Sequence, residues 1–488
     1  MSRKVTRREL LRVSALVGAG ALLAACQPKI VEVEKVVTKE VEKIVKETVE
    51  VEKEKIVEKE VTKVVEVEKV VKEIVIPAPK YEGVTIRFMS SYPITGTHPR
   101  AEFMQRVKEL FEAKHPGVTV EMERVPDIDV RWKTETAART LPVMLWDANM
   151  FCEMAEQGVF LELDDRLEDH PEVNLEKDYV IPGGAECMVY HQGKVVAMPY
   201  ILSGPVMLCN MDLFDRNGIE RPPDDWTWND LLDICKELTQ DTTGDGRIDQ
   251  WGFNGGTTWD ENFTQWIWTA GGEIISEDHK HTLVDSPEAK AAIQFYYDLR
   301  FKHNVWPRGE DTETMSVAGI TNPFAAGKVG IQCSNWGAIG AFKAFPDLNY
   351  DLLHFPKFPG NDKRYHWIFM QNFAAPSWSE YPELDADLVI ELGGPSSQRY
   401  AGRLKIQCPS YKKAIEEDFA TPPPENARVI LEIFAQYEVN HLPIFTGKTE
   451  WCVTVFGGEL TKAFIGEVDL DTAIKEAVLA GDRVLASY

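Results

Sequence analysis

The chain lacks the short motifs that mark common catalytic and metal sites. It has no Gly-x-Ser-x-Gly turn, no His-Glu-x-x-His pair and no phosphate-binding loop. Its eight cysteines are scattered, without a Cys-x-x-Cys pair or a histidine pair close by. A zinc centre is therefore not expected. No catalytic residue, no cofactor and no bound metal are therefore expected.

The chain also lacks basic charge. Lys and Arg number 53 against 78 Asp and Glu, so the formal net charge is −25. A chain this acidic is repelled by phosphate backbones, which argues against a nucleic-acid partner. Its 488 residues are too many for one hydrophobic core, so the folded part should form at least two lobes.

No apolar run is long enough to span a bilayer, which takes about 20 residues. The run from Val13 to Ala25 follows the paired Arg7-Arg8, resembles a signal peptide of the twin-arginine type, and ends at Leu23-Ala-Ala-Cys26. That ending resembles the lipobox of bacterial lipoproteins. We therefore expect residues 1–25 to be removed and Cys26 to carry the lipid (palmitate). The protein would then be anchored to the outer face of the cytoplasmic membrane or lie in the periplasm. Disulfides among the other seven cysteines stay open.

Glycine, proline and aromatic residues are absent from Ile30 to Ile76, which contains only Val, Ile, Glu, Lys and Thr. In places the apolar residues recur three or four apart, which favours a helix. Elsewhere Val and Glu alternate, which favours a strand. We predict a helical spacer, so that residues 26–79 form the lipidated N-terminus and a stalk. Pro77-Ala-Pro79 would close the stalk, and residues 80–488 would form the body.

The body has the pattern of an α/β protein. Val84–Met89 and Val118–Met122 are predicted strands, and Ala101–His115 is a predicted amphipathic helix between them. A strand, a helix and a strand at this spacing form a βαβ unit, which indicates a parallel sheet. The same kind of pattern predicts further helices at Asp230–Thr239, Pro287–His303 and Glu383–Leu392.

Several segments, in their order along the chain, share a resemblance to one family. They are Phe103–Val120, Leu141-Pro-Val-Met-Leu-Trp-Asp147, Gly193–Tyr200, Asn210–Ile219, Trp226-Thr-Trp-Asn-Asp-Leu-Leu232, and Phe324–Ile331 followed by Ser334-Asn-Trp336. This ordered set resembles the family 1 extracellular solute-binding proteins, the sugar-capturing components of ABC importers. Val143 departs from the pattern, because an aspartate is usual there.

The resemblance implies a two-lobe periplasmic-binding-protein-like fold (type II), with strands that cross a hinge. Lobe 1 would comprise about 80–202 plus about 368–425, and lobe 2 about 203–367 plus about 426–488. It also implies that a carbohydrate is captured in the cleft between the lobes and delivered to ABC permease subunits in the membrane. Closure of such lobes on a ligand is a hinge mechanism.

Sugar binding needs flat aromatic rings together with carboxylates, amides and hydroxyls. The resemblance places Trp336 where the family presents a ligand-stacking ring. From their types and positions we add eight further candidates: Trp146, Asp147, Asn149, Trp259, Glu261, Tyr200, Trp367 and Ser91. A single tryptophan is more often part of a core than of a binding site, and a surface carboxylate is usually only solvated. His366, beside Trp367, is expected to be a loop histidine with its hydrogen bonds satisfied, without ligand contact.

Asp241-Thr-Thr-Gly-Asp-Gly-Arg-Ile-Asp249 resembles half of a calcium loop, but Gly252 stands where the closing glutamate belongs. We interpret it as a rigid turn. Three alternatives to the sugar-binding interpretation stay open. The same fold could bind a peptide, a polyamine or another solute. The chain could be a secreted glycoside hydrolase, because carboxylates are abundant. It could also be a stalked adhesin.

Overall fold

The computed structural model describes residues 31–49, 57–75, 80–126, 128–146, 151–309, 311 and 322–488. Cys26 and the predicted signal peptide lie outside the described residues. Two compact units are present: one holds the stalk, and the other holds nearly all of the body. The stalk and the body are treated separately below.

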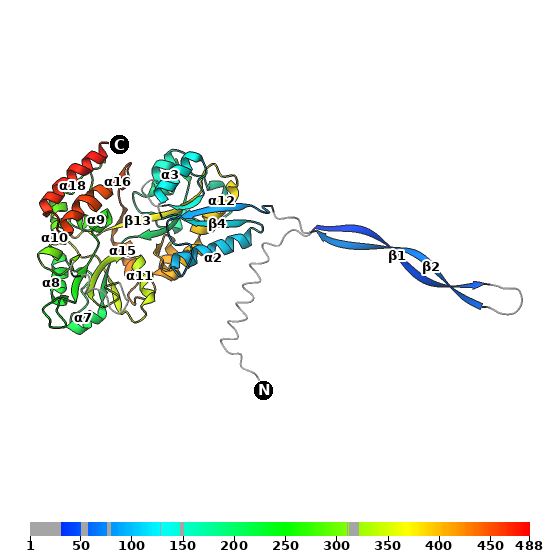
Figure 1. Ribbon diagram of the computed structural model, residues 1–488, viewed down its shortest axis with the longest axis horizontal. Helices are drawn as coiled ribbons and strands as arrows, with labels where there is room; N and C mark the ends of the chain where they lie inside the picture. Colours follow the sequence, from blue (N-terminus) through cyan, green and yellow to red (C-terminus); the bar gives the residue numbers. More distant parts are fainter. Residues whose placement is uncertain are drawn as a thin grey trace, which may run out of the picture. The chain divides into compact units, whose positions relative to one another are not determined.

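The stalk is a β-hairpin. Strands β1 (Val31–Val49) and β2 (Val57–Val75) pair antiparallel, with Val31 opposite Val75 and Val49 opposite Val57 (Figure 1). The prediction of a helical spacer is therefore wrong. Valine and isoleucine are branched at Cβ, which restricts their side chains in a helix and suits a pleated strand. In this low-complexity sequence, that preference outweighs the local helical spacing.

One sheet of the body has seven strands, in the order β14-β8-β13-β5-β3-β4, with β15 added alongside β13. Strands β3 and β5 run parallel, whereas β13 is antiparallel to both β5 and β8. The bounds are β3 (Thr85–Ser90), β4 (Thr119–Arg124), β5 (Val143–Trp146), β8 (Met198–Ser203), β13 (Tyr365–Ala374), β14 (Cys408–Pro409) and β15 (Glu438–His441).

The segments joined to this sheet are mostly short helices. They are α2 (Pro99–Lys114), α3 (Ile128–Ala138), α4 (Phe151–Glu156), α5 (Asp164–Leu167), α6 (Leu175–Asp178), η3 (Glu186–Met188), α12 (Pro382–Gly393), α13 (Pro395–Leu404), α14 (Lys412–Ala414) and the π-helical η6 (Ile415–Phe419). A small hairpin, β6 (Tyr190–His191) and β7 (Lys194–Val195), lies before β8. Helix α2 buries Phe103, Val107 and Phe111, as the amphipathic pattern predicts.

The second sheet has four strands, in the order β10-β11-β9-β12. They are β9 (Pro205–Asn210), β10 (Trp251–Asn254), β11 (Val329–Asn335) and β12 (Tyr350–Leu353). Its helical segments are α7 (Met211–Asn217), α8 (Trp228–Leu238), α9 (Asp260–Thr269), α10 (Pro287–Phe301), α11 (Gly337–Ala341), η5 (Phe342–Ala344), α15 (Val429–Gln436), α16 (Lys448–Cys452), η7 (Val453–Leu460), α17 (Thr461–Phe464) and α18 (Leu470–Leu485). Figure 1 shows α7, α8, α9, α10 and α18 gathered at one end of the body and α2, α3 and α12 at the other.

Tryptophan side chains fill much of the core beside the four-stranded sheet. Trp226, Trp228, Trp266, Trp306 and Trp451 are all buried in one hydrophobic cluster. Burying large aromatic side chains is a major source of core stability. Most of the tryptophans that are abundant in the sequence are thus structural.

A single residue joins the two sheets where the chain crosses between them. Gly204 lies between β8 of one sheet and β9 of the other. A Cβ atom on Gly204 would lie 2.7 Å from Nε2 of His366 and 3.0 Å from the carbonyl oxygen of Trp367. The crossing therefore requires glycine, because the start of β13 passes directly against it. The exact bounds of the two lobes stay a prediction.

The predicted body elements agree with the structure. The expected helices at 230–239, 287–303 and 383–392 correspond to α8, α10 and α12. Helix α8 begins with a capping box: the Thr227 hydroxyl accepts the N–H of Asp230, and the Asp230 carboxylate accepts the N–H of Thr227. Among the described helices, none combines the length and apolar character that crossing a bilayer requires.

Candidate functional site

A pocket with polar walls opens at one edge of the four-stranded sheet. Its volume is about 240 Å³. The residues that line it, which we call the polar pocket, are Pro205, Asn254, Gly255, Gly256, Glu261, Asn262, Gln265, Trp266, Gln332, Cys333, Ser334, Asn335 and Trp367. Strands β10 and β11 run parallel and both end here. Ligands of open α/β sheets commonly bind outside the carboxyl ends of such strands.

Gly256 shapes the loop between β10 and α9. A Cβ atom on Gly256 would lie 2.6 Å from Nδ2 of Asn262. The Asn262 side chain turns back on the same loop, where Oδ1 accepts the backbone N–H of Thr258 (3.2 Å) and of Trp259 (3.3 Å). This capping fixes the start of α9 and so positions Glu261, Gln265 and Trp266 along one wall.

Three buried polar atoms of the lining residues have no hydrogen-bond partner within the described part of the chain. They are Oε1 of Gln332 and Nε1 of both Trp266 and Trp367. Leaving such an atom unpaired costs about 1–3 kcal/mol. A hydroxyl group can accept from an indole N–H and donate to an amide oxygen. These three atoms are themselves buried, so a ligand with hydroxyl groups would pair with them only after the pocket wall moved. The lining, with its amides and Glu261, has the hydrogen-bonding character of a site for a polar ligand.

Gln265 holds Trp367 in place. Its Nε2 donates to the carbonyl oxygen of Tyr365 (2.7 Å), and its Oε1 accepts the backbone N–H of Trp367 (3.2 Å). The amide therefore ties helix α9 to the start of β13. A tryptophan fixed through its own backbone presents its ring at low cost in conformational entropy.

Of the residues chosen from the sequence, Glu261 and Trp367 line the polar pocket. Trp259 stands just before α9 and is 45% exposed. Trp146 ends β5, and Asp147 and Asn149 lie outside the described residues. Ser91 follows β3 and is half-buried. The structure thus brings two of these positions together, and the ligand roles of all of them stay predictions.

Tyr200 lies in the core of the seven-stranded sheet. Its ring contacts Phe103 and Phe373, at centroid distances of 5.0 and 4.6 Å. Burial raises the pKa of the hydroxyl well above its usual value, and the hydroxyl has no hydrogen-bond partner among the described residues. Tyr200 lines neither the polar pocket nor the larger groove described below.

Trp336 is fully buried, at 0% exposure, at the end of β11. Its ring stacks on His366 (centroids 5.3 Å apart, 16° between planes) and meets the ring of Phe434 at a steep angle (5.5 Å). A ligand could reach this ring only after one of these neighbours moved. His366 is likewise buried, and it lies in strand β13. Neither of its ring nitrogens has a hydrogen-bond partner among the described residues, so the expectation of a satisfied loop histidine is wrong. Desolvation lowers its pKa to about 3.

Sequence reasoning missed the five amides of the pocket, which are Asn254, Asn262, Gln265, Gln332 and Asn335. The available signal was their place at strand ends, since Asn254 ends β10 and Gln332 is a polar residue inside the apolar strand β11. Gln265 gives no such signal, because its role depends on β13, which lies about a hundred residues away.

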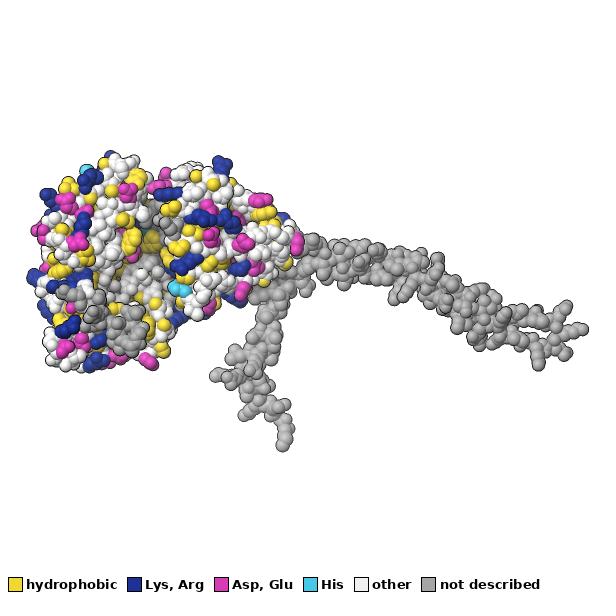
Figure 2. Space-filling model, in the orientation of Figure 1, with side chains coloured by type: hydrophobic (Ala, Val, Ile, Leu, Met, Phe, Trp, Pro, Cys, Tyr) yellow, Lys and Arg dark blue, Asp and Glu magenta, His cyan; other side chains and the backbone are white. Residues whose placement is uncertain are grey.

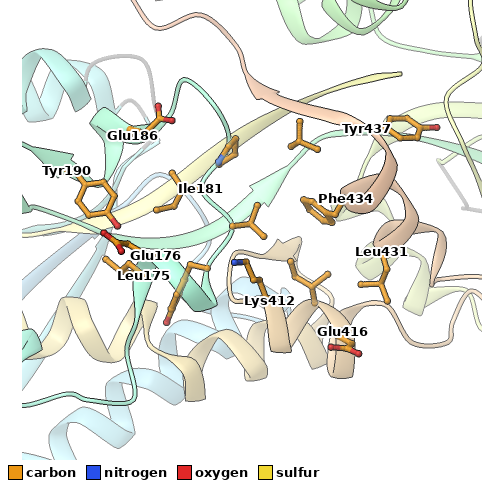
Figure 3. Close-up of a pocket in the computed structure, with 15 residues that line it drawn as sticks. Leu175, Glu176, Ile181, Glu186, Tyr190, Lys412, Glu416, Leu431, Phe434 and Tyr437 are labelled. Carbon is orange, nitrogen blue, oxygen red and sulfur yellow. The ribbon is translucent and has the colours of Figure 1, made fainter. Parts of the chain in front are cut away.

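A larger groove lies among α6, α14, α15 and β15, with a volume of about 820 Å³ (Figure 3). Its lining, which we call the apolar groove, comprises Leu175, Glu176, Tyr179, Val180, Ile181, Pro182, Glu186, Tyr190, Lys412, Ile415, Glu416, Leu431, Phe434, Tyr437 and Val439. Seven of these residues carry polar or charged side chains: Glu176, Tyr179, Glu186, Tyr190, Lys412, Glu416 and Tyr437. The Tyr179 hydroxyl donates to the carbonyl of Gly393, and the Lys412 ammonium donates to the carbonyl of Lys177. The groove is more spacious than the polar pocket, and no described residue of its lining has a buried side-chain N or O atom without a hydrogen-bond partner.

The Asp241 loop forms a turn in which backbone N–H groups donate hydrogen bonds to both oxygens of the Asp241 carboxylate. Oδ1 of Asp241 accepts the N–H of Gly244 (2.7 Å), and Oδ2 accepts that of Gly246 (2.7 Å). The Gly246 hydrogen bond is the main cause that lowers the pKa of Asp241. The interpretation as a rigid turn fits this geometry.

Cysteines play no part in the polar pocket beyond Cys333. Cys152 and Cys187 form a disulfide, and Cys209, Cys235, Cys333, Cys408 and Cys452 are free thiols. Burial raises the pKa of Cys333 to about 12, so its thiol stays protonated and unreactive.

On the face shown in Figure 2, acidic and basic side chains of the body are interspersed.

Known proteins resemble this chain in sequence and in fold. A family model described as "Bacterial extracellular solute-binding protein" matches residues 96–379. A putative binding protein of Brucella abortus (strain 2308) is 23% identical over 262 residues, 53% of this chain and 60% of that protein. This chain therefore spans about 60% of the length of the curated relatives it matches.

Solved structures share the fold. An ABC substrate-binding protein from Listeria monocytogenes, in complex with cycloalternan, superposes with a TM-score of 0.69 at 20% identity, covering 83% of this chain and 99% of that one. The maltose/maltodextrin-binding domain from Bdellovibrio bacteriovorus, bound to maltotriose, gives 0.65 at 17% identity, covering 83% and 100%. These likenesses confirm the predicted periplasmic-binding-protein fold. The family match also confirms the expectation of a binding protein instead of an enzyme. The chain belongs to the bacterial extracellular solute-binding protein family.

Proposed function

We propose that this protein captures a neutral carbohydrate in the polar pocket and delivers it to an ABC permease. One observation carries the proposal: three buried polar atoms, on Gln332, Trp266 and Trp367, are unpaired in a pocket walled by two indole rings. Sugars match this wall because they combine apolar C–H faces with hydroxyls that both donate and accept. The structural relatives described above were solved with oligosaccharides bound.

A ligand screen tests the proposal. A ligand that binds only the folded state raises the melting temperature of the protein. We expect neutral oligosaccharides such as maltotriose and mannobiose to raise it, and polyamines and peptides to leave it unchanged. A response to polyamines or peptides alone would establish the same fold with a different solute. Hydrolysis of an oligosaccharide during the incubation would instead favour the glycoside hydrolase.

The lipid anchor is part of the same proposal. The Leu-Ala-Ala-Cys26 ending after a short apolar run supports lipidation of Cys26 and location at the outer face of the cytoplasmic membrane or in the periplasm. We expect Cys26→Ser to prevent incorporation of labelled palmitate and to release the protein into soluble fractions. Labelled lipid in the Cys26→Ser protein would contradict this.

A further inference from the structure

Three potential metal ligands from separate segments converge beside α15. Asp224 comes from the loop before α8, His354 directly follows β12, and Glu432 lies on α15. Nε2 of His354 is 3.1 Å from Oε2 of Glu432 and 4.0 Å from Oδ1 of Asp224. One nitrogen and two carboxylate oxygens thus lie within 4.8 Å of one another. We call these three residues the His354 cluster.

The His354 imidazole is 1% exposed and has a polar neighbour at each ring nitrogen. A metal-binding histidine normally has its second ring nitrogen held by another group. Here Nδ1 lies 2.8 Å from the Tyr437 hydroxyl.

We propose that Asp224, His354 and Glu432 bind a divalent transition-metal ion of the zinc type. One imidazole nitrogen with two carboxylate oxygens is a donor set that Zn²⁺ accepts, whereas Ca²⁺ and Mg²⁺ prefer oxygen alone. Three protein ligands leave a fourth position for water. The side chains of Asp224 and Glu432 are 58% and 46% exposed, so the ion enters from solvent and both carboxylates can turn to close around it.

Metal binding requires the imidazole proton to move. Without metal, a consistent network has the Tyr437 hydroxyl donating to Nδ1, and Nε2–H donating to Glu432. With metal on Nε2, the proton resides on Nδ1 and is donated to the Tyr437 oxygen. That oxygen also accepts from Nη1 of Arg364 (2.7 Å), so its two lone pairs are used and its own hydrogen turns away. The proton count of the protein is unchanged.

Two arginines stand close to the cluster and moderate its affinity. Nη1 of Arg221 lies 3.4 Å from Oδ1 of Asp224, and Nη2 of Arg364 donates to the Asp224 carbonyl oxygen. Arg221 also contacts Asp351 (3.5 Å) and the carbonyl of Leu352, so it keeps partners when Asp224 turns to the ion. Their positive charge makes this a weaker site than a closed structural zinc site.

The ion would connect α15 to two segments next to the four-stranded sheet, the loop before α8 and the end of β12. Helix α15 also carries Phe434, whose ring contacts Trp336. Metal binding would thus fix the helix that contacts the buried tryptophan.

Calorimetric titration of the chelator-treated, full-length protein with ZnCl₂ tests the site. We expect saturable binding of one Zn²⁺ per chain. Glu432→Gln and Asp224→Asn should each weaken it at least about tenfold, because each removes a ligand while keeping the side-chain shape. Glu220→Gln is the matched control: it removes one exposed carboxylate from the same loop as Asp224, and binding should be unchanged.

Several outcomes would overturn the proposal. They are the absence of saturable Zn²⁺ binding, wild-type affinity in Glu432→Gln, and Mg²⁺ binding as tight as that of Zn²⁺, which would indicate an ordinary acidic surface. Zn²⁺ held by thiols would persist in both carboxylate variants and would likewise refute it. Melting curves without metal confirm that each variant is folded before it is titrated.

Discussion

The polar pocket is smaller than the apolar groove, but its lining has more buried polar atoms without a hydrogen-bond partner. The groove is larger, at about 820 Å³ against about 240 Å³, and its walls are mostly aliphatic and aromatic. The smaller pocket holds the unpaired atoms of Gln332, Trp266 and Trp367. By volume alone, the groove would be the candidate sugar site. The unsatisfied hydrogen-bonding groups favour the pocket, because a ligand with matching groups would offset the free energy that leaving them unpaired costs.

One stacked pair contacts residues of both cavities. Trp336 directly follows Asn335 of the polar pocket and touches Phe434 of the apolar groove. His366 precedes Trp367 of the pocket and lies edge-on to Tyr437 of the groove, at 6.2 Å. Changes to this pair should therefore affect the fold of the region, whereas changes to the lining should affect one cavity at a time.

The largest expected effect follows from removing the buried ring. Trp336→Ala should lower the free energy of unfolding by about 3–5 kcal/mol, because it leaves a cavity between His366 and Phe434. Chemical denaturation measures this. If Trp336 is the ligand-stacking ring that the resemblance implies, the same variant should also lose sugar affinity by at least about tenfold, which titration with sugar measures. Normal stability together with lost affinity would show that the ring serves the ligand alone.

Acid should destabilise the body through its buried histidines. Desolvation lowers the pKa of His366 to about 3, and the nearby His354 adds to this. The unfolded chain binds this proton near pH 6.5, so the full stability is present above pH 6.5 and is lost as the pH falls towards 3. His366 alone should cost about 1.4 kcal/mol per pH unit in that window, or roughly 2 kcal/mol at pH 5.

A matched pair of variants isolates this effect. His366→Phe keeps an aromatic ring against Trp336 and should flatten the dependence of stability on pH between 7 and 5. His281→Phe changes an exposed histidine and should leave the slope unchanged. Equal slopes in wild type and His366→Phe would mean that the imidazole is not buried as described.

Gln332→Leu tests which of the two cavities binds the sugar. It removes an unpaired buried oxygen, so sugar affinity should fall by about tenfold, or about 1.4 kcal/mol. The free protein should be equally stable or more stable, because an apolar group replaces an unsatisfied polar one. Leu431→Ala, in the apolar groove, is the control and should leave sugar affinity unchanged. Loss of affinity in Leu431→Ala alone would move the sugar site to the groove.

The smallest expected effect comes from the stalk. Deleting Ile30–Ile76 should change sugar affinity less than about twofold, or about 0.4 kcal/mol. The lining residues of both cavities lie between Leu175 and Val439, so the deletion removes none of them. Titration of the shortened protein against the full chain measures this. A large loss would assign the stalk a part in ligand binding.

Local patterns predicted the elements of the body well. The amphipathic face of α2 and the Pro287 that opens α10 depend on neighbours a few residues apart, which the sequence displays directly. The stalk was predicted wrongly because its short-range signals conflict: helical spacing and strand alternation coexist in one low-complexity stretch. There, the branched side chains decided for β structure.

The candidate site was predicted in part. Glu261 and Trp367 were named from their type and position, and both line the polar pocket. Gln332 and Gln265 were missed because an amide inside a strand or a helix has no local mark of function. Tyr200 has the type of side chain that binds sugars, an aromatic ring with a hydroxyl, yet packing against Phe103 and Phe373 places it in the core.

By itself, the sequence determined the family, the α/β class, the acidic character and the separation of a low-complexity stalk from the body. Each depends on composition or on short-range order, which folding does not change. Only the tertiary structure decided which of the tryptophans are buried and which amides remain unpaired. It also brought Asp224, His354 and Glu432 together from three segments. Burial and pairing are properties of contacts between distant residues, and such contacts form only when the two sheets and their helices pack.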